Sequence, residues 1–131
     1  MNILVDTHIL IWVLDEQYQL SGQRRKLLVD YENSVFASQI SFMELVIKKN
    51  LNKLPDFIPD ISDVAELWLN NGYKILPIDN KHIFAYQNLP LFDDHKDPFD
   101  RFLISTAMVE GMHLMTSDEK FNLYVSLLKI I

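Results

Sequence analysis

The chain has 131 residues, of which 49% are hydrophobic and 23% are charged. We expect a single domain over residues 1–131, because this is the commonest domain size and the apolar content fills one substantial core. Eighteen acidic residues against twelve basic ones give a net charge of −6, which argues against a protein that wraps nucleic acid with a broad basic face. The absence of cysteine excludes disulfides, thiolate nucleophiles and cysteine-based zinc sites.

The first apolar stretch, residues 2–14, is not typical of a signal peptide. It is interrupted by Asp6 and His8 and has no basic segment before it. No other run approaches the roughly 18 apolar residues that a membrane span requires. We therefore expect a cytoplasmic protein that has no membrane partner.

Blocks of apolar residues predict strands and helices that alternate along the chain. Residues 2–6 are a continuous apolar run that ends in Asp6, which is typical of a strand buried on both faces. In chain order, the next expected elements are a helix capped by Thr7 to Leu14, a helix capped by Ser21 to about Tyr31, a strand at 35–37, a helix from Ser41 to about Asn50 and a loop at 54–59.

The second half of the chain continues this alternation. Its expected elements are a helix from Asp60 or Ser62 to Asn71, a strand at 73–78, a short helix capped by Asp79 to about Tyr86, a helix begun by Asp97 and Pro98 and ended by Gly111, a strand at 112–115, a helical turn at 117–121 and a short strand within 124–131. Strands that alternate with helices predict an α/β fold with a central, mainly parallel sheet flanked by helices.

Four acids fall beyond the carboxyl ends of the predicted strands, where such sheets bind ligands. Asp6 directly follows the first strand, and Asp118 comes shortly after the fourth. Asp100 lies in the first turn of the helix before the fourth strand, and Glu44 in the first turn of the helix after the second strand. We expect the four side chains to face the same edge of the sheet.

Carboxylates gathered at one place repel one another and are costly to keep ionised unless cations lie between them. Oxygen ligands without cysteine favour hard ions, Mg²⁺ or Mn²⁺. Such a site supports metal-assisted hydrolysis of a phosphate ester, in which the ions activate water and neutralise the charge of the transition state.

Each acid taken alone also has a structural explanation. Asp100 suits the positive end of a helix dipole. Glu44, three residues after Ser41, has the spacing of a capping box, and Asp118 can cap the turn that follows it. Asp6 is different, because a carboxylate directly after a buried strand is hard to explain by packing. The metal-site hypothesis therefore depends on the four acids taken together.

Four segments carry a resemblance to a known family. They are Leu4-Val5-Asp6-Thr7-His8, Ser41-Phe42-Met43-Glu44 with Ile47-Lys48, His95-Lys96-Asp97-Pro98-Phe99-Asp100-Arg101, and Thr116-Ser117-Asp118-Glu119-Lys120-Phe121. In this order, over residues 2–131, the chain resembles PIN-domain proteins, and most closely the VapC-like toxins of bacterial and archaeal toxin–antitoxin pairs. The third segment is the most specific of the four.

The resemblance implies a PIN-like three-layer sandwich and an endoribonuclease that depends on Mg²⁺ or Mn²⁺. It assigns the catalytic and metal-binding roles to Asp6, Glu44, Asp100 and Asp118, with Glu44 acting directly or through water. It implies cleavage of RNA to 5′-phosphate and 3′-hydroxyl ends. It also implies a homodimer and a small DNA-binding antitoxin whose tail blocks the acidic site.

Accessory residues are expected around the acids. Thr7, Thr116 and Ser117 are candidates for hydroxyl donors that orient carboxylates, or for caps. Asp97 is expected to cap its helix and to pair with Arg101 four residues later, and a role for Asp97 as an outer metal or water ligand stays open.

Histidines and basic residues are less specific signals. No spacing supports a zinc site, so we expect His8 and His95 to make structural hydrogen bonds, with a phosphate contact by His95 as a second option. Six basic residues are either solvated helix faces or RNA contacts: Arg24, Arg25, Lys26, Lys48, Lys49 and Lys53.

Three other classes of function are weighed against this one. A haloacid-dehalogenase-type phosphatase also begins with an Asp after the first strand, but it needs a second Asp two residues later, where this chain has His8. A receiver module needs an Asp at a later strand and a Lys near the last strands, and no such set is present. A catalytically silent PIN-like interaction domain is separated from the enzyme by a metal-binding titration.

Overall fold

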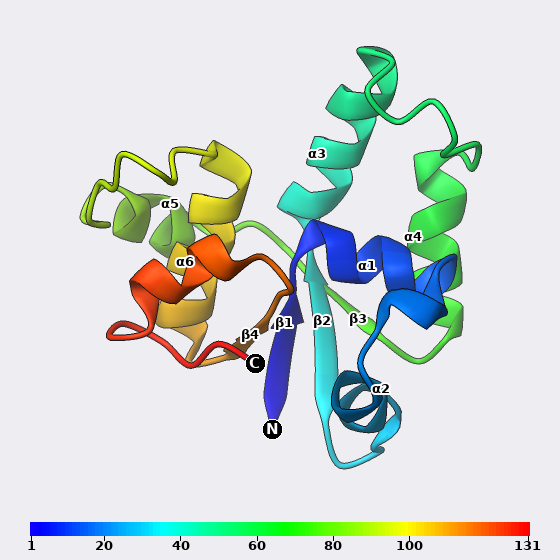
Figure 1. The fold of residues 1–131 in the computed structure, drawn as a ribbon, viewed down its shortest axis with the longest axis horizontal. Helices are drawn as coiled ribbons and strands as arrows, with labels where there is room; N and C mark the ends of the chain where they lie inside the picture. Colours follow the sequence, from blue (N-terminus) through cyan, green and yellow to red (C-terminus); the bar gives the residue numbers. More distant parts are fainter.

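The structure, a computed structural model of residues 1–131, is built on a four-stranded sheet with helices on both faces (Figure 1). The strands are β1 (Asn2–Val5), β2 (Ser34–Ser38), β3 (Lys74–Leu76) and β4 (His113–Met115), in the spatial order β3-β2-β1-β4. Every neighbouring pair is parallel. The expected α/β sandwich with a mainly parallel central sheet is confirmed.

Six α-helices and two short 3₁₀ helices connect and follow the strands. They are α1 (Thr7–Leu14), η1 (Gln17–Gln19), α2 (Gly22–Val29), α3 (Gln39–Asn50), α4 (Ile61–Asn70), α5 (Asn80–Tyr86), α6 (Pro98–Glu110) and η2 (Glu119–Tyr124). None of these helices combines the length and the apolar character that crossing a membrane demands.

The side chains of β1 divide the interior into two cores, because successive residues of a strand point to opposite faces. Ile3 and Val5 belong to a core shared with α1, α2, α3 and α4. Leu4, between them, belongs to a second core with α6 and η2. All three side chains are completely buried, and burial stabilises the fold by roughly 1.5–3 kcal/mol for each side chain of this size. The end of β1 therefore lies in the middle of the molecule, between two packed layers.

Helix α1 is capped by Asp6, whereas its sequence pattern predicts Thr7. Oδ1 of Asp6 accepts a hydrogen bond from the backbone N–H of Ile9 at 2.7 Å, which is the bond that an N-cap side chain makes. Asp6 stands between strand and helix with the extended backbone of a cap. Thr7 is already the first helical residue, and its hydroxyl is free for a contact elsewhere.

Helix α3 begins earlier than predicted. Ser38 is its N-cap, and Oγ of Ser38 accepts a hydrogen bond from the backbone N–H of Ile40 at 3.1 Å. Ser41 lies within the first turn, completely buried, and its Oγ has no hydrogen-bond partner. The predicted capping box of Ser41 and Glu44 is therefore wrong. Glu44 stands in the second turn of α3, where it makes tertiary contacts instead.

The last predicted strand, within 124–131, is also wrong. Tyr124 completes η2 and is fully buried in the second core, so the chain turns before it reaches the sheet. Only Ile130 makes a single parallel bridge to Leu114 of β4. Backbone bonds from Thr116 N–H to the Ile131 carbonyl (3.1 Å) and from Ile131 N–H to the Leu114 carbonyl (2.9 Å) hold the last residues along the outer edge of β4.

Smaller differences concern element ends. Helix α2 ends at Val29, two residues before the expected end near Tyr31, because Asp30 has left the helical conformation. Strand β3 keeps only three residues of the expected range 73–78. The helical turn expected at 117–121 is η2, which Asp118 caps.

Candidate active site

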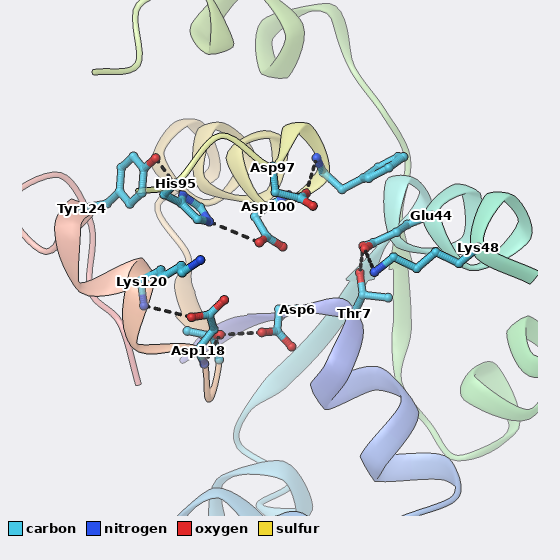
Figure 2. A network of polar contacts seen from close by, with 12 residues as sticks. Asp6, Thr7, Glu44, Lys48, His95, Asp97, Asp100, Asp118, Lys120 and Tyr124 are labelled. Atoms are coloured by element: carbon cyan, nitrogen blue, oxygen red, sulfur yellow. Dashed lines mark hydrogen bonds and ion pairs between the residues drawn. The ribbon is translucent and has the colours of Figure 1, made fainter. Parts of the chain in front are cut away.

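The strand order creates a topological switch point at the carboxyl ends of β1 and β4. After β1 the chain adds β2 and then β3 on one side, and it later returns through α6 to add β4 on the other side of β1. Connections that leave in opposite directions open a crevice beyond the strand ends, where α/β sheets bind ligands. Asp6 and Asp118 follow β1 and β4 here, and Figure 2 shows their carboxylates pointing to the same region as that of Asp100.

Asp6 is held in one orientation by two hydrogen bonds. The residue is 2% exposed, and besides the bond from Ile9 its Oδ2 accepts one from the hydroxyl of Thr116 at 2.5 Å. Burial raises the pKa of Asp6 above its usual value, and the two hydrogen bonds only partly offset this effect. The carboxylate also lies at the positive end of the α1 dipole.

The hydroxyl of Thr116 links Asp6 to Asp118. Besides donating to Asp6, Oγ1 of Thr116 accepts a hydrogen bond from the backbone N–H of Asp118 at 3.0 Å. Oδ1 of Asp118 caps η2 by accepting from the N–H of Lys120 at 2.9 Å, which leaves Oδ2 for a ligand. Arg24 of α2 donates to the Thr116 carbonyl at 2.6 Å and so fixes the turn after β4.

Asp100 comes from the first turn of α6, whose N-cap is Asp97. Oδ1 of Asp97 accepts from the backbone N–H groups of Phe99 (2.9 Å) and Asp100 (3.0 Å), so the expected cap is confirmed. The Asp100 side chain is 22% exposed. The pKa of Asp100 is raised to about 8. Burial is the largest cause, and repulsion by neighbouring carboxylates adds to the shift; these are Asp97, Glu44, Asp6 and Asp118. Cationic charge at this place relieves that repulsion.

His95 orients Asp100 and is itself oriented by a tyrosine. Nε2 of His95 lies 3.2 Å from Oδ2 of Asp100, and Nδ1 lies 2.9 Å from the hydroxyl of Tyr124 (Figure 2). Burial lowers the pKa of His95 below its usual value, which favours the neutral ring. With Asp100 ionised, Nε2–H donates to the carboxylate and Nδ1 accepts from the tyrosine. The structural role expected for His95 is confirmed.

Glu44 reaches the site from α3 with both carboxylate oxygens engaged. Oε1 accepts from the hydroxyl of Thr7 at 2.6 Å, and Oε2 lies 2.7 Å from Nζ of Lys48. The Glu44 side chain is 3% exposed, whereas that of Lys48 is 32% exposed. Burial acts to lower the pKa of Lys48, but Glu44 and the more distant Asp97 and Asp100 raise it above its usual value. Lys48 therefore brings a permanent positive charge to an acidic site.

Two of the expected accessory residues make no contact with the carboxylates through their side chains. Ser117 is exposed and makes no side-chain hydrogen bond, since Thr116 takes that role. Arg101 is buried and forms no ion pair with Asp97; its guanidinium donates to the Pro90 carbonyl at 2.9 Å and stacks over the ring of Tyr86. The expected pair of Asp97 and Arg101 is therefore wrong, because Arg101 points into the protein and fixes the loop before α6.

The donor set suits a hard divalent cation in its chemistry. The carboxylates of Asp6, Asp100 and Asp118 supply only oxygen ligands, and Oδ1 of Asp100 and Oδ2 of Asp118 have no hydrogen-bond partner in the protein. Burial and the four neighbouring carboxylates raise the pKa of Asp100, which agrees with an excess of negative charge on this side of the site. No group of three or more His, Asp or Glu side chains is already spaced to hold an ion, so binding requires the carboxylates to draw together.

Spacing along the sequence did not single out Lys48, Tyr124 or Arg24 as parts of the site. Lys48 had a usable signal, because residues four apart on a helix face each other. Tyr124 and Arg24 had none. Their partners His95 and Thr116 are 29 and 92 residues away in the sequence, and only the fold brings these groups together.

A family model gives the first comparison with known proteins. The model for the PIN domain matches residues 3–125, nearly the whole chain. Among curated proteins, none matches this sequence closely enough to be named as a relative.

Solved structures of similar fold give a second comparison. VapBC2 from Rickettsia felis, bound to a DNA fragment from its promoter, has a TM-score of 0.68 at 18% identity, with 100% of this chain and 98% of that chain covered. DNA-bound VapBC from Salmonella typhimurium has a TM-score of 0.67 at 15% identity, with 100% and 97% covered. VapBC-5 from Mycobacterium tuberculosis, described as a member of the VapBC family of toxin–antitoxin systems, has 0.57 at 16%, with 99% and 95% covered. At these identities the likeness shows a shared fold.

Proposed function

The chain belongs to the PIN domain family, and on that premise we propose that it is a Mg²⁺-dependent endoribonuclease, the toxin of a toxin–antitoxin pair acting in the cytoplasm. Members of this family are generally nucleases. The observation that carries the proposal is the position of Asp6, Asp100 and Asp118. They come from the ends of β1 and β4 and from the start of α6, and they point to one region of the switch-point crevice.

In this proposal Asp6, Asp100 and Asp118 hold Mg²⁺ or Mn²⁺, and Glu44 takes part directly or through water. When bound, the ion supplies positive charge to the scissile phosphate and makes the attacking water more acidic. Thr116 keeps Asp6 and Asp118 in a fixed relation, and His95 keeps Asp100 directed into the crevice. The products are RNA ends with a 5′-phosphate and a 3′-hydroxyl.

The protein's own side chains offer no evident covalent route. Ser41, Thr7 and Thr116 are all buried, so their hydroxyls are not open to a substrate, and Ser41 also has no base in contact. An activated nucleophile must reach the substrate, and it must also lie within hydrogen-bond distance of a base that removes its proton. Direct attack by water is therefore the step that this site serves.

The test of the proposal is RNA cleavage by the purified full chain. We expect cleavage of single-stranded RNA in Mg²⁺ or Mn²⁺, none in chelator, and 5′-phosphate ends on the downstream fragments. Asp6→Asn should abolish cleavage, while Asp30→Asn, an exposed residue at the end of α2, should not change it. A folded chain that neither binds the metal ion nor cleaves RNA would favour the silent interaction domain.

The proposed partners are a second copy of the chain and a small DNA-binding antitoxin. The solved VapBC complexes with DNA support the choice of the antitoxin, because this chain shares their fold, whereas the second copy follows only from the resemblance in sequence. An acidic crevice that accepts Mg²⁺ also accepts a guanidinium, since Arg presents a fork of donors matched to carboxylates. We therefore expect an antitoxin tail with an Arg to inhibit cleavage at Asp100 and Asp118.

Inhibition measured across a Mg²⁺ series with the cognate antitoxin tests this partner. Changing the tail Arg to Ala should abolish inhibition, and neutralising Asp100 or Asp118 should weaken it. Raised Mg²⁺ should relieve inhibition in part by competition, while the wider protein–protein interface keeps the complex together. If inhibition is unchanged both by the tail Arg→Ala change and by neutralising Asp100 or Asp118, the antitoxin blocks RNA access elsewhere.

A further inference from the structure

The carboxylates of the site are not equivalent, because Glu44 alone is paired with a lysine of the protein. Asp6 also accepts a hydrogen bond at each oxygen, from the Ile9 N–H and the Thr116 hydroxyl, but both of these donors are neutral. Each of the two Glu44 oxygens has a short contact, with the Thr7 hydroxyl at 2.6 Å and the Lys48 ammonium at 2.7 Å. Its side chain is 3% exposed. Asp100 has only the 3.2 Å contact with His95, and Asp118 uses only one oxygen, for its cap. Recruiting Glu44 to a metal ion would break its ion pair with Lys48, whereas recruiting Asp100 or Asp118 would break no lysine pair.

The position of Lys48 is set by the helix that carries Glu44. The two residues are four apart on α3, and the order of Glu before Lys is the favourable one on a helix. Glu44 therefore fixes the ammonium group at the rim of the crevice. Figure 2 shows Nζ of Lys48 directed to Glu44 and Thr7 from the α3 side, opposite His95 and Tyr124. The ammonium also attracts Asp97 and Asp100.

The number and charge of the available carboxylates favour a site for one divalent ion over a site for two. The three remaining carboxylates, Asp6, Asp100 and Asp118, carry a charge of −3. One divalent ion brings this to −1, and Mg²⁺ is commonly bound by few carboxylates, with waters and substrate phosphates completing its shell. Two ions would reverse the charge to +1 and would have to share three side chains. Asp97 is exposed, and its Oδ1 is used to cap α6.

We propose that Lys48 takes the place of a second metal ion, so that the protein without RNA binds one divalent ion through Asp6, Asp100 and Asp118 while Glu44 holds the ammonium group. This inference rests on the proposed function and, of the two roles that it leaves open for Glu44, excludes direct coordination of the ion. An ammonium has three N–H donors, and one of them meets Glu44. The others are available to a phosphate oxygen of bound RNA, the role of a second cation.

The experiment counts Mn²⁺ bound to the metal-free full chain, by electron paramagnetic resonance of free Mn²⁺ and by calorimetry. We expect one ion for the wild type. Lys48→Met keeps the length of the side chain but removes its charge; it should free Glu44 and bind two ions. The double variant Lys48→Met with Glu44→Gln should return to one ion. Lys53→Met removes a positive charge from an exposed residue whose pocket includes Asp15 and Asp56 and none of the four acids of the site, and it should bind one ion like the wild type.

Single variants keep the proposal testable if Lys48→Met does not fold. Glu44→Gln should change Mn²⁺ affinity less than about threefold, whereas Asp100→Asn should lower it at least tenfold. Lys48→Arg keeps the charge and should bind one ion. Two ions on the wild type, one ion on folded Lys48→Met, or a tenfold loss of affinity in Glu44→Gln would each overturn the proposal.

The outcome is separable from that of the proposed function. A chain that binds one ion with these variant effects but cleaves no RNA would refute the ribonuclease and leave the ion count standing. A chain that cleaves RNA with two ions bound would do the reverse.

Discussion

On the α3 side of the site a carboxylate has a lysine at 2.7 Å, and on the α6 side a carboxylate has a histidine at 3.2 Å. The first pair, Glu44 and Lys48, balances its own charge. The second pair does not, because burial and four neighbouring carboxylates raise the pKa of Asp100 to about 8. The contrast teaches that the fold balances the negative charge of one wall of the site internally and leaves that of the other wall unbalanced.

The largest expected effect is on catalysis when the uncompensated wall is changed. Asp100→Asn or Asp6→Asn should lower the rate of RNA cleavage at least about a hundredfold, since loss of groups that only support metal ligands already costs 10–100-fold. Asn is also a good N-cap, so Asp6→Asn should stay folded, as circular dichroism can check. Near-wild-type cleavage by either variant would contradict the view that the carboxylates without a protein cation carry the activity.

Metal binding should stabilise the fold through the same wall. At a hundredfold excess over the dissociation constant, Mg²⁺ should add roughly 2.7 kcal/mol to the free energy of unfolding, measured by thermal denaturation against chelator. Asp118→Asn should reduce this gain, whereas Asp30→Asn, with a matched loss of charge on α2, should retain it. Equal gains in all three proteins would place the ion elsewhere.

Without metal, the stability of the fold should depend on pH through Asp100. Its pKa is raised in the folded state, so between pH 3.9 and about 8 the folded protein holds a proton that the unfolded chain has lost. The free energy of unfolding therefore falls as pH rises, by at most about 1.4 kcal/mol per pH unit. From pH 6.5 to 8 in chelator, the midpoint of thermal unfolding should fall on the order of 5 °C.

Above pH 6.5, the change of stability with pH does not include a contribution from His95. The pKa of His95 is lowered in the folded state, so its own contribution raises stability with pH, and it does so below about pH 6.5. Burial also raises the pKa of Asp6, which acts in the same direction as Asp100. Asp100→Asn should flatten the slope without abolishing it. A slope identical to that of the wild type would show that Asp100 is ionised without a cation.

The smallest effects come from two matched threonines. Thr116→Val removes the donor to Asp6 and should lower Mn²⁺ affinity about tenfold, the usual scale for a group that orients a ligand. Thr7→Val removes the donor to Glu44 and should cost about 1 kcal/mol of stability but leave Mn²⁺ affinity unchanged. Calorimetric titration of both variants measures this, and an equal loss of affinity would mean that the two walls serve the ion alike.

The sequence predicts the acids of this site better than their partners. Asp6, Asp100 and Asp118 follow from a general rule, since the carboxyl ends of parallel strands meet at one edge. The contact of Thr7 with Glu44 joins residues 37 apart, and no spacing rule supplies it. It depends on α1 and α3 both starting at this edge, from neighbouring strands.

The errors in predicted elements have local physical reasons. Ser38 and Ser41 are both good N-caps, and the Glu44 spacing favoured the wrong one, because propensity cannot register that Ser41 is buried by packing. The apolar run from Tyr124 predicts a strand, because a short apolar run has no periodicity that distinguishes a strand from a turn packed into the core. In the structure Tyr124 fills the second core and ends η2.

The chain's last residues, lying along β4, also bear on self-association. An uncovered edge strand offers unpaired N–H and carbonyl groups on which other chains can assemble by sheet extension. The bonds of Ile131 to Leu114 and Thr116 occupy that edge of this sheet. The opposite edge, β3, is only three residues long and begins with the exposed Lys74, a short and charged strand that is a poor template for aggregation. Both borders of the sheet are thus protected against fibre-like growth, one by a covering segment and the other by brevity and charge.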